Sequence, residues 1–323
     1  MEYLLFLQAI REQSGAWLCS LADWVTKFSV SYWPFAIVSM IYWVFDRKAG
    51  RRLLGGVSFG LLFNGFLKVT FCVLRPWLRD PRIEPWGDSK VAATGYSFPS
   101  GHASFSTALL VGSGWWERKR HIYLTVAAFV MEAMIMLSRN FLGVHTLEDV
   151  LVGFASSCLA LVVAAALENW TDQDPSRDRW YIVGGLVLCV LLVLYYEFKS
   201  FPLVYTEDGS LLVDPVKMRS DSFEGIGALS TFVICRYIER RRFQFDKLLS
   251  WKNRFIIGTF AMIPGYWLFS KTVTLVQSFS NRSVGKYAWF TVMLLYTMLL
   301  VPYVMEQIAK RCKWVQTDEL EQA

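Results

Sequence analysis

Most of the unusual polar residues of this chain fall in three short segments between residues 68 and 149. Cations and imidazoles dominate them. Arg offers a planar fork to an oxyanion, Lys a point charge, and a histidine can act as a nucleophile or a proton donor. Cations this close together would repel a metal ion and favour an anion, and phosphate suits such a set best. The segments are Lys68 through Arg75-Pro76, Pro99-Ser100-Gly101-His102, and Ser138-Arg139 through His145 to Asp149.

Lys68 and Arg75 are seven residues apart, about two helical turns, so they share one face of a helix that Pro76 ends. A lysine inside an apolar run is costly without a partner or a water-filled cavity, which makes Lys68 a candidate for function. The alternative is that its long side chain reaches the lipid headgroups and has no further role.

Ser100 precedes an apolar run, so it is expected to cap a helix whose first N–H groups point outward. Such a helix end binds phosphate readily, and Gly101 lacks the Cβ that would keep an anion away from the backbone. His102 then projects from the first turn. The alternative is that Pro-Ser-Gly is simply a favourable start for a helix.

His145 and Asp149 are four apart and would share a helix face. Asp149 could then accept the imidazole N–H, which fixes the tautomer and leaves the other nitrogen free to attack. A second role competes for Asp149, because Thr146-x-x-Asp149 resembles a capping box at the start of the next helix. The two roles are compatible.

The composition excludes an ordinary soluble enzyme. Of the 323 residues 54% are hydrophobic and only 19% are charged, against about 25% in an average soluble domain. The apolar residues form runs near 20 residues, the length that crosses a bilayer, and backbone groups inside lipid must pair within their own segment. We therefore expect an all-α, polytopic membrane bundle of about nine transmembrane helices. The expected spans are 28–45, 53–74, 102–116, 122–138, 149–168, 180–198, 222–235, 255–275 and 287–307.

The distribution of Lys and Arg predicts the orientation of these spans. Alternate loops, beginning with 46–52, and the C-terminal tail hold 19 of the 33 Lys and Arg residues. The positive-inside rule places that set in the cytoplasm. The three motif segments then share the non-cytoplasmic face.

The chain divides into three expected parts. Residues 1–27 mix Leu, Phe and Trp with charged side chains, which is typical of an amphipathic helix lying in the membrane interface. Residues 28–170 hold the phosphate-directed motifs and would be the catalytic core. Residues 171–323 would add further transmembrane helices, of scaffold or substrate-portal type, and a cytoplasmic C-terminal tail.

The three segments together resemble the type 2 phosphatidic acid phosphatase superfamily, whose pattern is K-x6-RP, PSGH and SR-x5-H-x3-D. The resemblance implies a phosphatase that needs no metal or other cofactor. It implies that His145 forms a phosphohistidine, His102 protonates the leaving oxygen and Asp149 orients His145. The residues it implies for holding the phosphate are Lys68, Arg75, Ser100, Gly101 and Arg139.

The superfamily includes enzymes for lipid phosphates, polyprenyl diphosphates and glucose 6-phosphate, so resemblance alone does not fix the substrate. A membrane site suits an amphiphile, and we expect a phosphorylated lipid as substrate, membrane lipids as neighbours and no nucleic-acid partner. A soluble sugar phosphate is the alternative substrate. A non-catalytic lipid binder or transporter is a further alternative, although it would have little use for His102, His145 and Asp149 together. A bacterial plasma membrane is the expected location.

Overall fold

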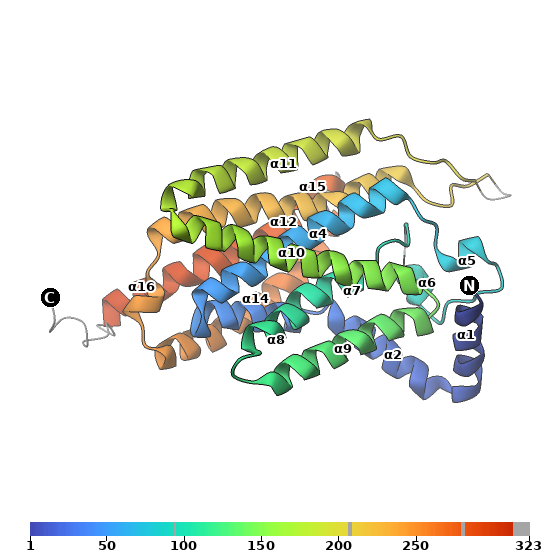
Figure 1. Cartoon of the computed structure of the whole chain (residues 1–323), viewed down its shortest axis with the longest axis horizontal. Helices are drawn as coiled ribbons and strands as arrows, with labels where there is room; N and C mark the ends of the chain where they lie inside the picture. The colour runs from blue at the N-terminus through green and yellow to red at the C-terminus, as the bar shows by residue number, and fades with distance from the viewer. Residues whose placement is uncertain (94, 206–208, 279–281, 313–323) are drawn as a thin grey trace.

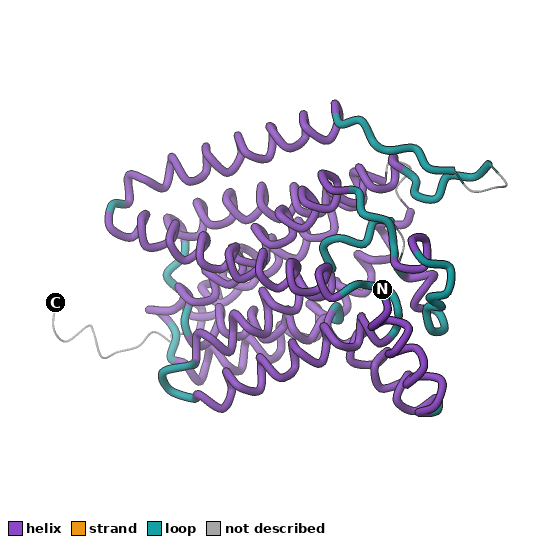
Figure 2. Tube along the Cα trace, turned by 45° about the vertical axis from the view of Figure 1, so that its right-hand side comes forward, coloured by secondary structure: helices purple, strands orange, loops and turns teal. Residues whose placement is uncertain are grey.

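The computed structural model describes residues 1–93, 95–205, 209–278 and 282–312. Within these ranges the chain consists of helices and connecting loops, with one isolated bridge between Tyr205 and Leu211 and no strand (Figure 2). The expectation of an all-α fold is confirmed. The predicted C-terminal tail from residue 313 onward lies outside the described residues.

Each segment predicted to cross the membrane is helical over most of its length. Short π-helical turns interrupt three of them, at η1 (Ile41–Phe45), η2 (Thr107–Val111) and η4 (Tyr296–Leu300), and a 3₁₀ turn η3 (Pro175–Arg177) precedes α11. The α-helices are α1 (Glu2–Ser14), α2 (Ala16–Ser29), α3 (Tyr32–Met40), α4 (Arg47–Phe71), α5 (Pro76–Arg79), α6 (Ser89–Ala92), α7 (Gly101–Ser106), α8 (Gly112–Glu117), α9 (Ile122–Phe141), α10 (Leu147–Gln173), α11 (Asp178–Phe198), α12 (Pro215–Arg242), α13 (Phe245–Leu248), α14 (Trp251–Ser278), α15 (Arg282–Leu295) and α16 (Val301–Cys312).

The long helices lie side by side, and their connections gather at the two ends of the bundle (Figure 1). Helix α4 packs against both α10 and α12, and α12 packs in turn against α15. One end holds the last turn of α4, the first turn of α7 and the α9–α10 connection. The short helix α1 crosses this same end (Figure 1).

Five described helical stretches are long and apolar enough to cross a membrane. A sixth is possible where α2 continues through a bend of 42° into α3 and η1. This supports an integral membrane protein, while the expected number of nine spans stays a prediction. The expected interfacial segment 1–27 is helical as α1 and most of α2, and its place in a membrane also stays a prediction. The five stretches are Arg47–Arg79, Ile122–Phe141, Leu147–Gln173, Pro175–Phe198 and Arg282–Cys312.

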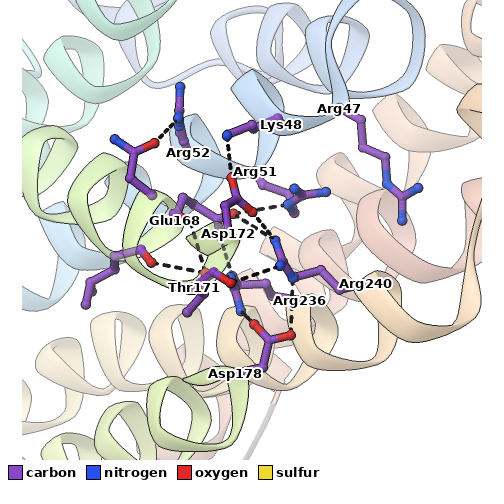
Figure 3. Close-up of polar contacts among 12 residues, drawn as sticks. Arg47, Lys48, Arg51, Arg52, Glu168, Thr171, Asp172, Asp178, Arg236 and Arg240 are labelled. Atoms are coloured by element: carbon purple, nitrogen blue, oxygen red, sulfur yellow. Dashed lines mark hydrogen bonds and ion pairs between the residues drawn. The ribbon is translucent and has the colours of Figure 1, made fainter. Parts of the chain in front are cut away.

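A buried ion-pair network joins the helices at the opposite end of the bundle (Figure 3). Arg236 of α12 pairs with Glu168 of α10 and, at 2.8 Å, with Asp178 at the start of α11. Arg51 of α4 lies 3.3 Å from Glu168 and 3.4 Å from Glu239. Removing one partner of such a buried pair costs about 3–5 kcal/mol, so this network fixes α11 and α12 onto α4 and α10.

The same network changes the meaning of the charge count. Arg47, Arg51, Arg236 and Arg240 belong to the arginine-rich loops that predicted the orientation, yet all four form ion pairs inside the protein. These four side chains therefore have a structural role that is independent of the side of the membrane on which they lie.

Candidate active site

The three motif segments meet at one cavity of about 450 Å³ at the end of the bundle. Helix α4 contributes Lys68 from its last turn, and Arg75 follows at the N-cap of α5. The first turn of α7 contributes Gly101 and His102. The last turn of α9 contributes Arg139, and the loop before α10 contributes His145. The cavity walls include Lys68, Arg75, Gly101, His102, Arg139 and His145.

His145 is buried between a carboxylate and a guanidinium. Its Nδ1 lies 3.4 Å from Asp149 Oδ2, and its Nε2 lies 2.9 Å from Arg75 Nη1. A guanidinium can only donate, so Nε2 must be the acceptor nitrogen and the ring proton lies on Nδ1, facing Asp149. This is the tautomer in which Nε2 carries the lone pair, and that lone pair faces Arg75, another residue of the cavity wall.

The surroundings of His145 also determine its protonation. Burial, followed by the positive charges of Arg75 and Arg139, holds the pKa of the His145 imidazole well below its ordinary value. The ring is therefore neutral at neutral pH. A neutral imidazole is the form that can attack a phosphorus atom.

Asp149 has both of the roles considered from the sequence. Its Oδ2 accepts the Thr146 backbone N–H at 2.8 Å, while Thr146 Oγ1 accepts the Asp149 N–H at 3.4 Å, which completes a capping box at the start of α10. The same Oδ2 accepts a hydrogen bond from Ser97 Oγ. The carboxylate is therefore held in place by three groups, the imidazole among them.

Arg139 and Lys68 are the cations most in need of an anion. Arg139 is 3% exposed, and its Nε has no hydrogen-bond partner among the described residues. Lys68 Nζ donates to the Tyr96 carbonyl at 3.3 Å. Within the described ranges neither cation has a carboxylate at salt-bridge distance. A buried cation such as Arg139 is costly without a counter-ion, and an anion in the cavity would remove that cost.

The PSGH segment forms the start of α7 as expected. Ser100 Oγ accepts the Ala103 N–H at 3.5 Å, and the Ser100 N–H donates to the Asp149 carbonyl at 2.8 Å. Ser100 is fully buried, and Gly101 and His102, not Ser100, line the cavity. Its hydroxyl is therefore engaged in the capping role that was considered as the alternative, and its expected contact with phosphate stays a prediction.

Two asparagines support the site and were not singled out from the sequence. Asn64 lies one turn before Lys68 on α4, and its Nδ2 donates to Ser104 Oγ at 2.9 Å, which ties α4 to α7. Asn140 Nδ2 donates to the His145 carbonyl at 2.9 Å. For Asn64, the available signal was an amide inside an apolar run on the same helix face as Lys68.

The second half of the chain forms the opposite wall of the cavity. Asp221 and Glu224 of α12 and Lys286 of α15 line it, beside aromatic side chains. Lys286 Nζ lies 3.5 Å from both carboxylates. Helices α12 to α15 were expected to be scaffold or portal, and these contacts show that they also shape the cavity. The aromatic members of this wall are Phe269 and Trp289.

The match to a family model falls on the segment that builds this cavity. Residues 49–173 match the model of the PAP2 superfamily. This range contains all eight site residues predicted from the motifs and runs from the start of α4 to the end of α10.

Among curated proteins, the chain is similar to sphingosine-1-phosphate phosphatase 1 of Mus musculus, with 28% identity over 50% of the chain and 37% of that protein. It is 24% identical to sphingosine-1-phosphate phosphatase 2 of Homo sapiens over 82% of the chain and 64% of that protein. It is 26% identical to a putative undecaprenyl-diphosphatase of Escherichia coli (strain K12) over 47% of the chain and 74% of that protein. The chain thus spans little more than a third of the mouse protein's length.

No solved structure gives a significant match to the chain. The family match and the curated relatives agree with the motif pattern. Residues 49–173 thus carry the similarity to the PAP2 superfamily that the motif pattern predicted.

Proposed function

We propose that this protein is an integral-membrane phosphatase that needs no metal and hydrolyses a lipid phosphate or polyprenyl diphosphate through a phosphohistidine. One observation carries the proposal. In a cavity lined by cations, a neutral imidazole is held between Asp149 and Arg75, with its lone pair on the nitrogen that faces Arg75. This arrangement matches the requirements of a nucleophile for an anionic phosphate ester.

The reaction would proceed in two displacements. His145 Nε2 attacks phosphorus, the P–O bond to the lipid breaks, and His102, which the negative charge of the bound phosphate would keep protonated, transfers its proton to the leaving oxygen. Asp149 stabilises the positive charge that develops on the His145 ring. Water then attacks the phosphohistidine, His102 takes a proton from that water, and the P–N bond breaks to release phosphate.

The cations would stabilise the negative charge that spreads over the phosphoryl oxygens in both displacements. Arg75 now donates to Nε2, and a phosphate oxygen would replace that nitrogen as its acceptor. Arg139 has an unused buried N–H, and Gly101 leaves the start of α7 open to the anion. These groups are in place before substrate arrives, so little reorganisation is needed.

We place this cavity on the non-cytoplasmic face and propose that all nine predicted segments cross the membrane. The loops at the opposite end still include exposed cations outside the ion-pair network, such as Lys119 and Arg120. Helices α12 and α14 have 28 residues each, more than the roughly 20 that a helix needs to cross the bilayer core.

A lipid is the favoured substrate because the described wall combines cations with Phe105, Phe269 and Trp289. Such a cavity accommodates a charged headgroup beside an apolar chain. The named relatives agree with this choice, since the mouse and human proteins are named for sphingosine 1-phosphate and the Escherichia coli protein for undecaprenyl diphosphate.

The test is phosphate release in detergent with EDTA, measured for the wild type, His145→Ala and His121→Ala. The substrates are phosphatidate, sphingosine 1-phosphate, undecaprenyl diphosphate and glucose 6-phosphate. We expect release from at least one lipid by the wild type and by His121→Ala, and none by His145→Ala. His121 is the matched control because it is exposed and lies at the other end of the bundle, before α9.

Two results would contradict the proposal. Preference for glucose 6-phosphate would assign the protein to the sugar phosphate branch. Binding of lipid phosphate by folded wild-type protein without any release would support the binding-only alternative.

A further inference from the structure

Helix α1 contacts the catalytic end of the bundle through buried polar groups. It crosses the end of the bundle where α9 stops and α10 starts (Figure 1). Leu4 and Arg11 of α1 are both buried, Arg11 with only 7% of its surface exposed. A buried arginine on a peripheral helix is unusual unless its guanidinium is fully engaged.

The Arg11 guanidinium joins two loops at this end of the bundle. Its Nη1 donates to the Phe141 carbonyl at 2.9 Å, and its Nη2 donates to the Glu84 carbonyl. Phe141 is the last residue of α9, where the final carbonyl groups have no partner within their own helix. Arg11 therefore caps α9 from outside and ties it to the loop that follows α5.

Further contacts hold α1 against both sides of His145. The Leu147 N–H donates to the Tyr3 hydroxyl, and the Glu84 N–H donates to Gln8 Oε1 at 2.9 Å. Between Phe141 and Leu147 the chain is held in a tight turn at Gly143, whose φ is 73°. A Cβ at Gly143 would lie 3.4 Å from Arg11 Nη1 and from the Glu84 carbonyl oxygen, so the turn packs directly on the Arg11 guanidinium.

We propose that α1 is a brace for the His145 loop and that Arg11 is its positioning residue. Arg11 does not line the cavity and is not expected to contact substrate. It fixes the carbonyl four residues before His145, while Tyr3 fixes the N–H two residues after it. A nucleophile displaced by about 1 Å can lose roughly 100-fold in rate, so a loose loop would lower kcat. The consequence for catalysis rests on the proposed role of His145, whereas the brace itself does not.

The matched control is a second link between α1 and the same region. Arg82 Nη2 lies 3.0 Å from Glu2 Oε1, but these side chains are 62% and 82% exposed. Exposed pairs of this kind contribute little to stability. Arg82→Ala thus removes a contact of α1 without loosening the buried attachment.

The experiment compares full-length wild type, Arg11→Ala, Arg11→Lys and Arg82→Ala. Phosphate release is measured over a range of phosphatidate and sphingosine 1-phosphate concentrations, below the melting temperature of every variant. Hydrogen exchange of residues 142–147 is followed on the same samples. We expect Arg11→Ala to lower kcat by at least about tenfold with KM within about threefold, and to speed exchange in this loop. Arg11→Lys, which keeps one donor, should recover part of kcat, and Arg82→Ala should match the wild type.

Two results would overturn the brace. The first is unchanged loop exchange in both Arg11 variants, and the second is an Arg82→Ala variant that loses as much kcat as Arg11→Ala. Unchanged kcat with faster exchange would overturn the catalytic consequence. If the wild type releases no phosphate, the proposed function fails, and the exchange measurement still decides whether Arg11 holds the loop.

Discussion

The start of α7 allows a substitution with opposite expected effects on stability and on activity. A Cβ built at Gly101 would meet only one described side-chain atom within 4 Å, Asn64 Oδ1 at 3.7 Å, which is an ordinary contact. Gly101 has helical backbone angles, and alanine is favoured over glycine in a helix by about 0.5–1 kcal/mol. Gly101→Ala should therefore fold, with stability equal to the wild type or slightly higher.

The activity of Gly101→Ala should fall, because the new methyl group points into space that the phosphate would occupy. Losing one hydrogen bond between an anion and the helix N–H groups costs about 1.5–3 kcal/mol, which corresponds to roughly 10- to 150-fold in kcat/KM. The assay is phosphate release from a lipid phosphate, with thermal unfolding measured in parallel. Gly184→Ala in α11 is the control, since its Cβ would meet no described atom within 4 Å. A kcat/KM of Gly101→Ala equal to that of the wild type would refute phosphate binding by the N–H groups at the start of α7.

Three further outcomes can be checked on the same preparation. Asp149→Asn keeps an oxygen that can cap α10 but loses the negative charge that faces His145 Nδ1. We expect kcat to fall by about 10²–10⁴-fold, while circular dichroism shows that the protein stays folded. Burial and neighbouring cations lower the pKa of His145, so the ring stays neutral as the pH falls to about 6.5. After correction for ionisation of the substrate, kcat/KM should therefore begin to fall on the acid side only below that pH. A midpoint of the acid limb above pH 6.5 would contradict the lowered pKa of His145. Arg139→Ala should raise KM and lower kcat together, and a KM change alone would limit Arg139 to ground-state binding.

The convergence of the motifs could be predicted from the sequence because helix periodicity and membrane topology are both local rules. Lys68 and Arg75 lie seven apart, and the four-residue spacing of His145 and Asp149 predicted that they share a helix face. Six of the eight predicted site residues line one cavity, and Asp149 contacts His145 from behind it.

Other features depend on tertiary contacts that no local rule contains. Arg11 looks like an ordinary charge on an amphipathic helix until α1 is packed across the end of α9. Asp221, Glu224 and Lys286 reach the cavity only because α12 packs against α4 and α15 packs against α12. Likewise, Arg51 and Arg236 are indistinguishable in sequence from loop cations that orient a membrane protein, and only their burial shows the ion pairs.

The central claim is that His145 becomes covalently phosphorylated during turnover. The most direct test is to mix the protein with phosphatidate or sphingosine 1-phosphate that carries a radioactive phosphate, stop the reaction in alkali and map the label. The phosphoramidate bond of phosphohistidine is expected to survive alkali and to be lost in acid. We predict that the wild type carries the label on the peptide that contains His145. Turnover without any label on that peptide, or equal label in His145→Ala, would contradict the account.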